Sequence, residues 1–359
     1  MEKNWMTNTD MIKTSSQRCL KRLLEEPPDN VAKRKPAPQV PHPPTTGLSP
    51  FAGTRNPSPK SSQSKAPSRV GQYTLVERYE GEEVYRAEHS QTKKQFTCQV
   101  LSLHSYQDFL IAYNRIGQHE SICSLLDTVI CGDRAYVFLS GHYGDMHTYV
   151  RRWKRLSEDE MRHLFTQVLN AVSHCHQHGV ILRDLKLRKF VFTDKNRTRL
   201  ALLSLNDCTV LYGNHGDDSL TDRHGCPAYV SPELLTNGKG SYSGRAADIW
   251  SLGVSLYTML VGRYPFQEMQ PAALFAKIRH GAFSLPEWLS PQAKCLIGCM
   301  LRKSPAERLK ASELLMHPWL TSPSRPHRST HKTQRSSQQV LQIKQEDNQV
   351  VPTWTEKAQ

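Results

Sequence analysis

The chain has 359 residues, of which 38% are hydrophobic, so it can bury one large core or two modest ones. Its formal net charge of +14 is uneven: residues 1–70 carry +7 and residues 321–359 carry +3, which leaves +4 for residues 71–320. This distribution argues against a folded domain that binds nucleic acid and favours basic tails. The longest apolar run, residues 249–261, is too short to cross a bilayer, so no membrane contact is expected.

The N-terminal tail, residues 1–70, is rich in Pro, Ser and Lys and poor in large apolar side chains. Burial cannot offset the entropy of ordering such a segment, so we predict that it is disordered. Two basic clusters with ten residues between them have the form of a bipartite nuclear-import signal. The clusters consist of Lys21, Arg22, Lys33, Arg34 and Lys35. We therefore expect the protein in both nucleus and cytoplasm; a merely solvated basic tail is the alternative.

The folded domain is predicted to begin with a strand at residues 73–76 and a hairpin partner at 83–87. In protein kinases, a glycine-rich loop between two such strands lets backbone N–H groups approach the ATP phosphates. Here Glu77, Tyr79 and Glu82 stand at the three glycine positions. Two carboxylates would repel phosphate, so we expect no phosphate cradle.

The next predicted strand, residues 96–100, carries Gln99 where a kinase has the lysine that pairs with the α- and β-phosphates. An amide has no charge to offer a phosphate. A short helix over residues 106–116 is expected to follow, and it has no glutamate placed to pair with such a lysine. A strand at 133–139 and a hinge at 140–142 would complete a small β-rich lobe.

A long helix is predicted to begin at Ser157, because Glu160 follows this capping residue at the distance of a capping box. Near its end, His174, His176 and His178 alternate by two. That spacing does not place all three on one helical face, so we expect structural or surface histidines and no metal site there.

The nine cysteines contain no C-x-x-C pair. Cys295 and Cys299 are close in sequence, but no complementary His/Cys pair follows at a spacing typical of zinc sites. We therefore expect reduced thiols and no bound metal.

The segment at residues 182–190 matches part of the kinase catalytic loop, H-R-D-L-x-x-x-N. Asp184 and Lys186 are retained, but Lys189 replaces the Asn that holds a magnesium ion. Ser204 then replaces the magnesium-binding Asp of the Asp-Phe-Gly motif. Phosphoryl transfer depends almost wholly on positioning and electrostatic stabilisation, so these losses predict a chain with no functional catalytic residue. Asp184 is expected to remain as a structural residue that fixes the loop.

The architectural marks of a kinase C-terminal lobe are present. Asp248 begins a D-x-W-S-x-G-V helix, and Glu233 ends an A-P-E-like segment, where we expect it to pair with Arg308. The predicted fold class is therefore α+β: a bilobal protein-kinase-like fold with a small β-rich N-lobe (71–140), a larger helical C-lobe (141–320) and disordered N- and C-terminal tails.

Together these motifs resemble those of the Tribbles pseudokinases over residues 71–320 and into both tails. The resemblance rests on four short segments: 144–147, 182–186, 204–205 and 226–230. Tribbles proteins usually keep the strand lysine, and Gln99 departs from that pattern. ATP binding is therefore expected to be weak or absent, without magnesium, and no other cofactor is implied.

The C-terminal tail, residues 321–359, ends in a segment that resembles the Tribbles peptide that recruits a RING E3 ubiquitin ligase of the constitutive-photomorphogenesis type. An extended peptide of this composition can place its apolar residues in a pocket of a propeller domain and its acid on the basic rim. The residues expected to bind the ligase are Asp347, Gln349, Val350, Val351 and Pro352.

A second segment resembles the part of Tribbles proteins assigned to binding MAP kinase kinases. Its expected docking residues are Leu315, His317, Pro318, Trp319 and Leu320. Kinases commonly end their last helix with H-P-W-apolar for packing, so docking and packing both stay open as interpretations.

The resemblance implies a catalytically inactive scaffold that brings the ligase to C/EBP-type and other bZIP transcription factors and promotes their degradation. It also implies regulation of MAP kinase kinases and of Akt. Linking substrate and ligase on one chain would favour ubiquitin transfer through effective concentration. The alternatives are an inhibitor that docks kinases without recruiting the ligase, and a weak metal-independent nucleotide binder in which Lys189 partly replaces a metal's charge. No direct contact with nucleic acid is expected.

Overall fold

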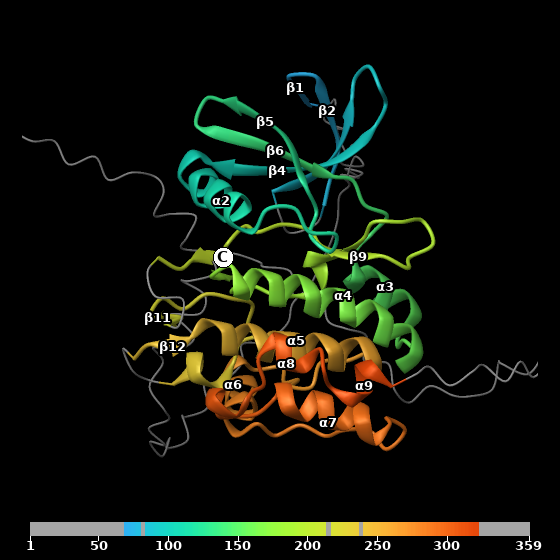
Figure 1. Ribbon diagram of the computed structural model, residues 1–359, viewed down its shortest axis with the longest axis vertical. Coiled ribbons are helices and arrows are strands. Elements are labelled where there is room, and N and C mark those ends of the chain that lie inside the picture. Colours follow the sequence, from blue (N-terminus) through green and yellow to red (C-terminus); the bar gives the residue numbers. More distant parts are fainter. Residues whose placement is uncertain (1–67, 80–82, 213–216, 237–239, 323–359) are drawn as a thin grey trace, which may run out of the picture.

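The computed structural model describes residues 68–79, 83–212, 217–236 and 240–322 (Figure 1). The predicted nuclear-import clusters, the predicted ligase-binding peptide and Glu82 of the expected phosphate loop lie outside these residues. Within them, the chain forms two lobes: a β-sheet with one helix, and a larger lobe made mostly of helices (Figure 1). This is the bilobal kinase-like arrangement that the sequence predicted.

The smaller lobe is an antiparallel six-stranded sheet in the order β1-β2-β3-β4-β6-β5. Its elements are β1 (Ser68–Val70), β2 (Tyr73–Arg78), β3 (Val84–His89), β4 (Gln95–Ser102), α2 (Leu103–Ile116), β5 (Leu125–Cys131) and β6 (Arg134–Ser140). The sheet begins three residues before residue 71, the expected start of the domain, because β1 pairs with β2 in the register Ser68 to Leu75. One face of the sheet is closed by the rings of Tyr73, Phe96 and Phe138, and Tyr73 stacks on Phe138 with centroids 3.7 Å apart.

Helix α2 is longer at its start than the expected span of 106–116. The Ser102 side chain accepts a hydrogen bond from the Ser105 N–H at 3.1 Å, which caps the helix three residues earlier. The helix buries Phe109, Tyr113 and Ile116, and these side chains belong to the same apolar cluster as the core of the larger lobe. The two lobes therefore share one continuous apolar core.

The larger lobe contains seven α-helices within its described residues, with short strands and 3-10 turns between them. The helices are α3 (Met146–Trp153), α4 (Glu158–Gln177), α5 (Gly244–Val261), α6 (Pro271–His280), α7 (Pro291–Met300), α8 (Ala311–Leu314) and α9 (Pro318–Thr321). The short strands are β7 (Val180–Ile181), β8 (Phe190–Phe192), β9 (Leu200–Leu202), β10 (Thr209–Val210), β11 (Ser219–Leu220) and β12 (Tyr242–Ser243). The 3-10 turns are η2 (Leu187–Lys189), η3 (Pro232–Leu235) and η4 (Pro305–Glu307).

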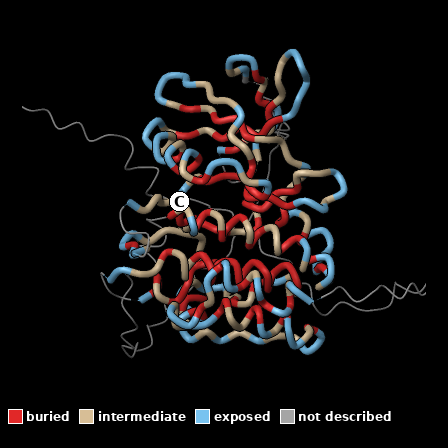
Figure 2. The backbone as a smooth tube through the Cα atoms, in the orientation of Figure 1, coloured by how far each residue is buried: buried red, intermediate tan, exposed pale blue. Residues whose placement is uncertain are grey.

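Helices α4 and α5 form the centre of this lobe, where Figure 2 shows most buried residues. Ser157 caps α4 by accepting from the Glu160 N–H, as the sequence predicted. Helix α5 is buried at every position from Asp248 to Leu260, which accounts for the long apolar run in the sequence. Across the part of the chain that the structure describes, no helix has the length and apolar character needed to span a bilayer.

Candidate functional site: the degenerate nucleotide cleft

Gln99 on β4 of the smaller lobe and Ser204 after β9 of the larger lobe are both buried, at the positions that face the nucleotide cleft of a kinase. The Ser204 hydroxyl donates to the Gln99 side-chain oxygen at 2.6 Å, and the same hydroxyl accepts from the Asn206 N–H at 3.2 Å. This bond joins the two lobes through neutral groups. It occupies the two positions where a kinase would present a lysine to phosphates and a carboxylate to magnesium.

Lys189 takes the position of the second magnesium ligand, on η2, and only 5% of it is exposed. Its ammonium donates to the Asn206 carbonyl at 3.2 Å and to the Asp207 carboxylate at 3.4 Å. It also lies 3.7 Å from the Asp184 carboxylate. No kinase motif includes Asp207, so its role was not predicted. The sequence signal that could have pointed to it is the unpaired cation that Lys189 introduces into the loop.

Asp184 is held between two cations. Lys186 lies 2.9 Å and Lys189 3.7 Å from the same carboxylate oxygen. Burial raises the pKa of Asp184, but the two ammonium groups outweigh that effect and hold the pKa well below its ordinary value. A carboxylate stabilised so strongly in its charged form is a weak proton acceptor, so the geometry favours a structural role.

The loop that carries Asp184 is fixed from beneath by Asp248, which is 1% exposed. Its carboxylate accepts from the N–H groups of Leu182 and Arg183, both at 2.8 Å, and lies 2.9 Å from His176 Nε2. These contacts hold Arg183 at a positive φ of 64°. Asp248 thus shapes the catalytic-type loop although the loop has lost its metal ligand.

The other two histidines of the predicted group also make structural contacts. His174 Nε2 lies 2.8 Å from the Ile116 carbonyl, and His178 Nδ1 lies 2.8 Å from the His174 carbonyl. The His174 ring stacks on His119 with centroids 4.5 Å apart, and the tilted His178 ring lies 4.2 Å from it between centroids. These contacts agree with the expected structural roles and tie the end of α2 to the end of α4.

Glu233 and Arg308 meet as the sequence predicted. Two guanidinium nitrogens of Arg308 each donate to a Glu233 carboxylate oxygen at 2.7 Å. The remaining donors reach the carbonyls of Ala246, Arg302 and Lys303 at 2.8–3.2 Å. This fully hydrogen-bonded pair fixes the end of the activation-type segment to the base of α5 and η4.

The described part of the phosphate loop also departs from a kinase cradle. Glu77 lies 3.4 Å from Arg86 in an exposed ion pair, so its charge is directed along the sheet surface. The Tyr79 ring lies over His142 at the hinge, with centroids 5.3 Å apart. A side-chain contact thus stands at the second glycine position, where a kinase brings bare backbone to the phosphates.

The segment proposed for kinase docking is partly internal. Trp319 is 1% exposed and its indole donates to the Glu158 carboxylate at 2.8 Å, while His317 is 8% exposed. Leu315 and Leu320 are half-buried, and Pro318 is exposed. Packing therefore accounts for Trp319 and His317, and any docking surface here would consist of the other three residues.

Comparisons with known proteins agree with this fold. A family model of the protein kinase domain matches residues 80–320. Tribbles homolog 2 from Canis lupus familiaris is 47% identical over 306 residues, which cover 85% of this chain and 88% of the relative. This chain belongs to the Tribbles family of pseudokinases.

Two other Tribbles homologs match to a similar extent. Tribbles homolog 1 from Homo sapiens is 48% identical over 284 residues, covering 79% of this chain and 75% of the relative. Tribbles homolog 3 from Bos taurus is 48% identical over 296 residues, covering 82% and 81%. The motifs favour a nearest likeness to Tribbles homolog 3, but these identities do not separate the three homologs, so that finer assignment stays a prediction.

Proposed function

We propose that this Tribbles protein is a non-catalytic adaptor that brings a RING E3 ubiquitin ligase of the constitutive-photomorphogenesis type to its substrates. The observation that carries the proposal is that the polar side chains at the former nucleotide site are paired with one another. Gln99 and Ser204 bond to each other, and Lys189 is held by Asp184 and Asp207. By contrast, the contacts that shape the C-lobe are present: Asp248 holds the 182–190 loop, and Glu233 pairs with Arg308.

A nucleotide would meet two physical obstacles in this cleft. It would have to compete with the 2.6 Å bond between buried Gln99 and Ser204. It would also find that the nearby ammonium groups are already paired with carboxylates, so they have little net positive charge to offer phosphates. Both obstacles support a domain kept for binding proteins.

The adaptor would work by proximity. A substrate bound to the C-lobe and a ligase bound to the tail of the same chain meet at a raised effective concentration, so no catalytic step is needed here. By the family resemblance, we propose C/EBP-type and other bZIP transcription factors as substrates, and Akt and MAP kinase kinases as signalling partners. The two basic clusters of the N-terminal tail would place this activity in the nucleus as well as the cytoplasm.

The first test is the binding of a peptide of residues 341–359 to the propeller domain of that ligase. Micromolar affinity, roughly −8 kcal/mol, is expected. A peptide carrying Val351→Ala and Pro352→Ala is the matched control, and it should not bind. Equal binding of both peptides, or of neither, would contradict ligase recruitment through this segment.

A second test separates the adaptor from an inhibitor that only docks kinases. Full-length protein and a form that lacks residues 341–359 are compared for the turnover of a bound partner and for binding to MAP kinase kinase and Akt. The adaptor predicts that deletion abolishes the enhanced turnover and preserves binding. If turnover is unchanged by the deletion, the ligase is not recruited through the tail for that partner.

The third test addresses nucleotide binding through thermal unfolding with millimolar ATP, with and without magnesium. The proposal predicts no rise in Tm in either condition. A rise without magnesium that disappears in Lys189→Ala would instead support the metal-independent nucleotide binder.

A further inference from the structure

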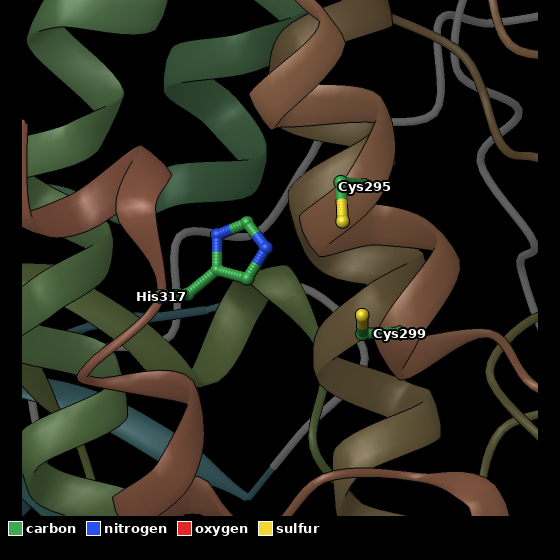
Figure 3. A group of neighbouring side chains, drawn as sticks. All are labelled: Cys295, Cys299 and His317. Atoms are coloured by element: carbon green, nitrogen blue, oxygen red, sulfur yellow. The ribbon is translucent and has the colours of Figure 1, made fainter.

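Three side chains that the spacing argument left unconnected meet on the larger lobe (Figure 3). Cys295 and Cys299 lie one turn apart on α7, and His317 is the capping residue of α9. Their potential ligand atoms, the two sulfurs and a ring nitrogen, all lie within 4.8 Å of one another. Figure 3 shows the two sulfurs pointing toward one another and a ring nitrogen of His317 facing them.

We propose that Cys295, Cys299 and His317 form a site for a soft divalent metal ion, with Zn²⁺ as the ion that this donor set favours. Two thiolates and an imidazole are typical zinc ligands, and the i, i+4 spacing puts both sulfurs on one helical face. In a tetrahedral site with zinc–sulfur bonds of about 2.3 Å, the sulfurs lie about 3.8 Å apart. Closing the observed group around an ion therefore needs movements of only about 1 Å.

The exposure of the ligands indicates an open coordination sphere. His317 is 8% exposed, Cys299 is half-buried, and Cys295 is exposed to solvent. Both cysteines border an open groove of about 480 Å³. Three protein ligands with access from one side match zinc sites that keep a fourth position for water or an external ligand. The geometry therefore assigns that fourth position to the groove side.

The charges around the group also suit a metal held by two thiolates. The groove carries the basic residues Lys294, Arg302 and Lys303, which would repel a bare cation. His280 and a single carboxylate, Glu307, also line it and offset only part of that charge. A divalent ion with two thiolates is neutral overall, so that repulsion is largely cancelled. Binding the ion would release the two thiol protons, and its charge would then compensate both thiolates.

His317 couples the site to the start of α9. In the metal-free chain, its Nδ1 accepts from the Trp319 N–H at 3.1 Å, which places the ring proton on Nε2. A metal bound at Nε2 takes the place of that proton, so the ring must carry its proton on Nδ1 instead. The Nδ1–H then faces the Trp319 N–H, which is also a donor, so this hydrogen bond must open. The site therefore lacks the outer-shell acceptor of a pre-organised zinc histidine. We expect affinity roughly 10- to 100-fold weaker than that of a site with such an acceptor.

The test uses full-length protein freed of metal with a chelator and titrated with Co²⁺ under reducing conditions. Co²⁺ reports thiolate ligation through its charge-transfer absorption and tetrahedral geometry through the intensity of its visible bands. One equivalent of Co²⁺ should give both signals, one equivalent of Zn²⁺ should displace it, and Zn²⁺ should raise Tm. The absence of this charge-transfer absorption would overturn the proposal.

Matched variants assign the signal to this site. Cys299→Ser and His317→Asn should each weaken binding at least about 10-fold, and the asparagine keeps an acceptor for the α9 cap. Cys131→Ser removes an exposed cysteine elsewhere and should bind like the unmodified chain. Unchanged binding by Cys299→Ser would overturn the proposal. The metal-free Tm of each variant shows whether it folds, and because Cys295 is exposed, Cys295→Ser gives a second test with little risk to the fold.

Discussion

Replacing Arg308 by methionine should strongly destabilise the pseudokinase domain. The guanidinium makes five hydrogen bonds, two of them to Glu233, and its charged group is completely buried. Methionine keeps the apolar stem and removes every donor, so the 13%-exposed Glu233 carboxylate and three backbone carbonyls lose their partner. Breaking one side of such a buried pair costs roughly 3–5 kcal/mol.

Urea denaturation followed by circular dichroism measures this loss, and the midpoint should fall in proportion to the lost free energy of unfolding. The exposed Arg279 on α6 offers a matched control, and Arg279→Met should change stability by less than about 0.5 kcal/mol. Adding Glu233→Gln to Arg308→Met should recover part of the loss, because no buried charge then remains unpaired. A loss under about 1 kcal/mol for Arg308→Met alone would refute the reasoning.

Three further predictions concern the cleft, a helix end and pH. Ser204→Ala should lower the free energy of unfolding, measured by urea denaturation, by about 1–3 kcal/mol, because it leaves the buried Gln99 oxygen without its donor. Adding Gln99→Leu to this variant should restore part of the lost stability, because the unpaired oxygen is then removed. Gly262→Ala should cost about 2 kcal/mol or more, because φ is +83° and the new Cβ would collide with the backbone carbonyl oxygen of Lys154. The control Gly298→Ala meets nothing within 4 Å and should not destabilise. Burial lowers the pKa of His142 in the folded chain, so below about pH 6.5 the unfolded chain binds a proton that the folded chain does not, and stability decreases as the pH is lowered. His142→Gln should make this decrease smaller between about pH 7 and 5, and equal slopes for the variant and the unmodified chain would contradict the prediction.

Much of the fold followed from local sequence. The helix that begins after Ser157 and the strand that contains Gln99 depend on short-range capping, periodicity and residue type, which a linear sequence displays directly. The replacements at Lys189 and Ser204 could likewise be identified from the motifs around them. Strands β1 and β5 were not predicted, because both are defined by pairing with β2 and β6. The earlier start of α2 comes from a single side-chain cap.

The tertiary structure decided what those residues contact. Lys189 pairs with Asp184 and Asp207 because the loop after β9 packs against the 182–190 loop, and the kinase motifs in the sequence do not show that packing. Two cysteines and a histidine 18 positions beyond the second cysteine meet because α9 packs beside α7. A sequence gives the type and order of side chains, but the distance between side chains far apart in the chain is set by packing, and charge pairing and metal ligation depend on that distance.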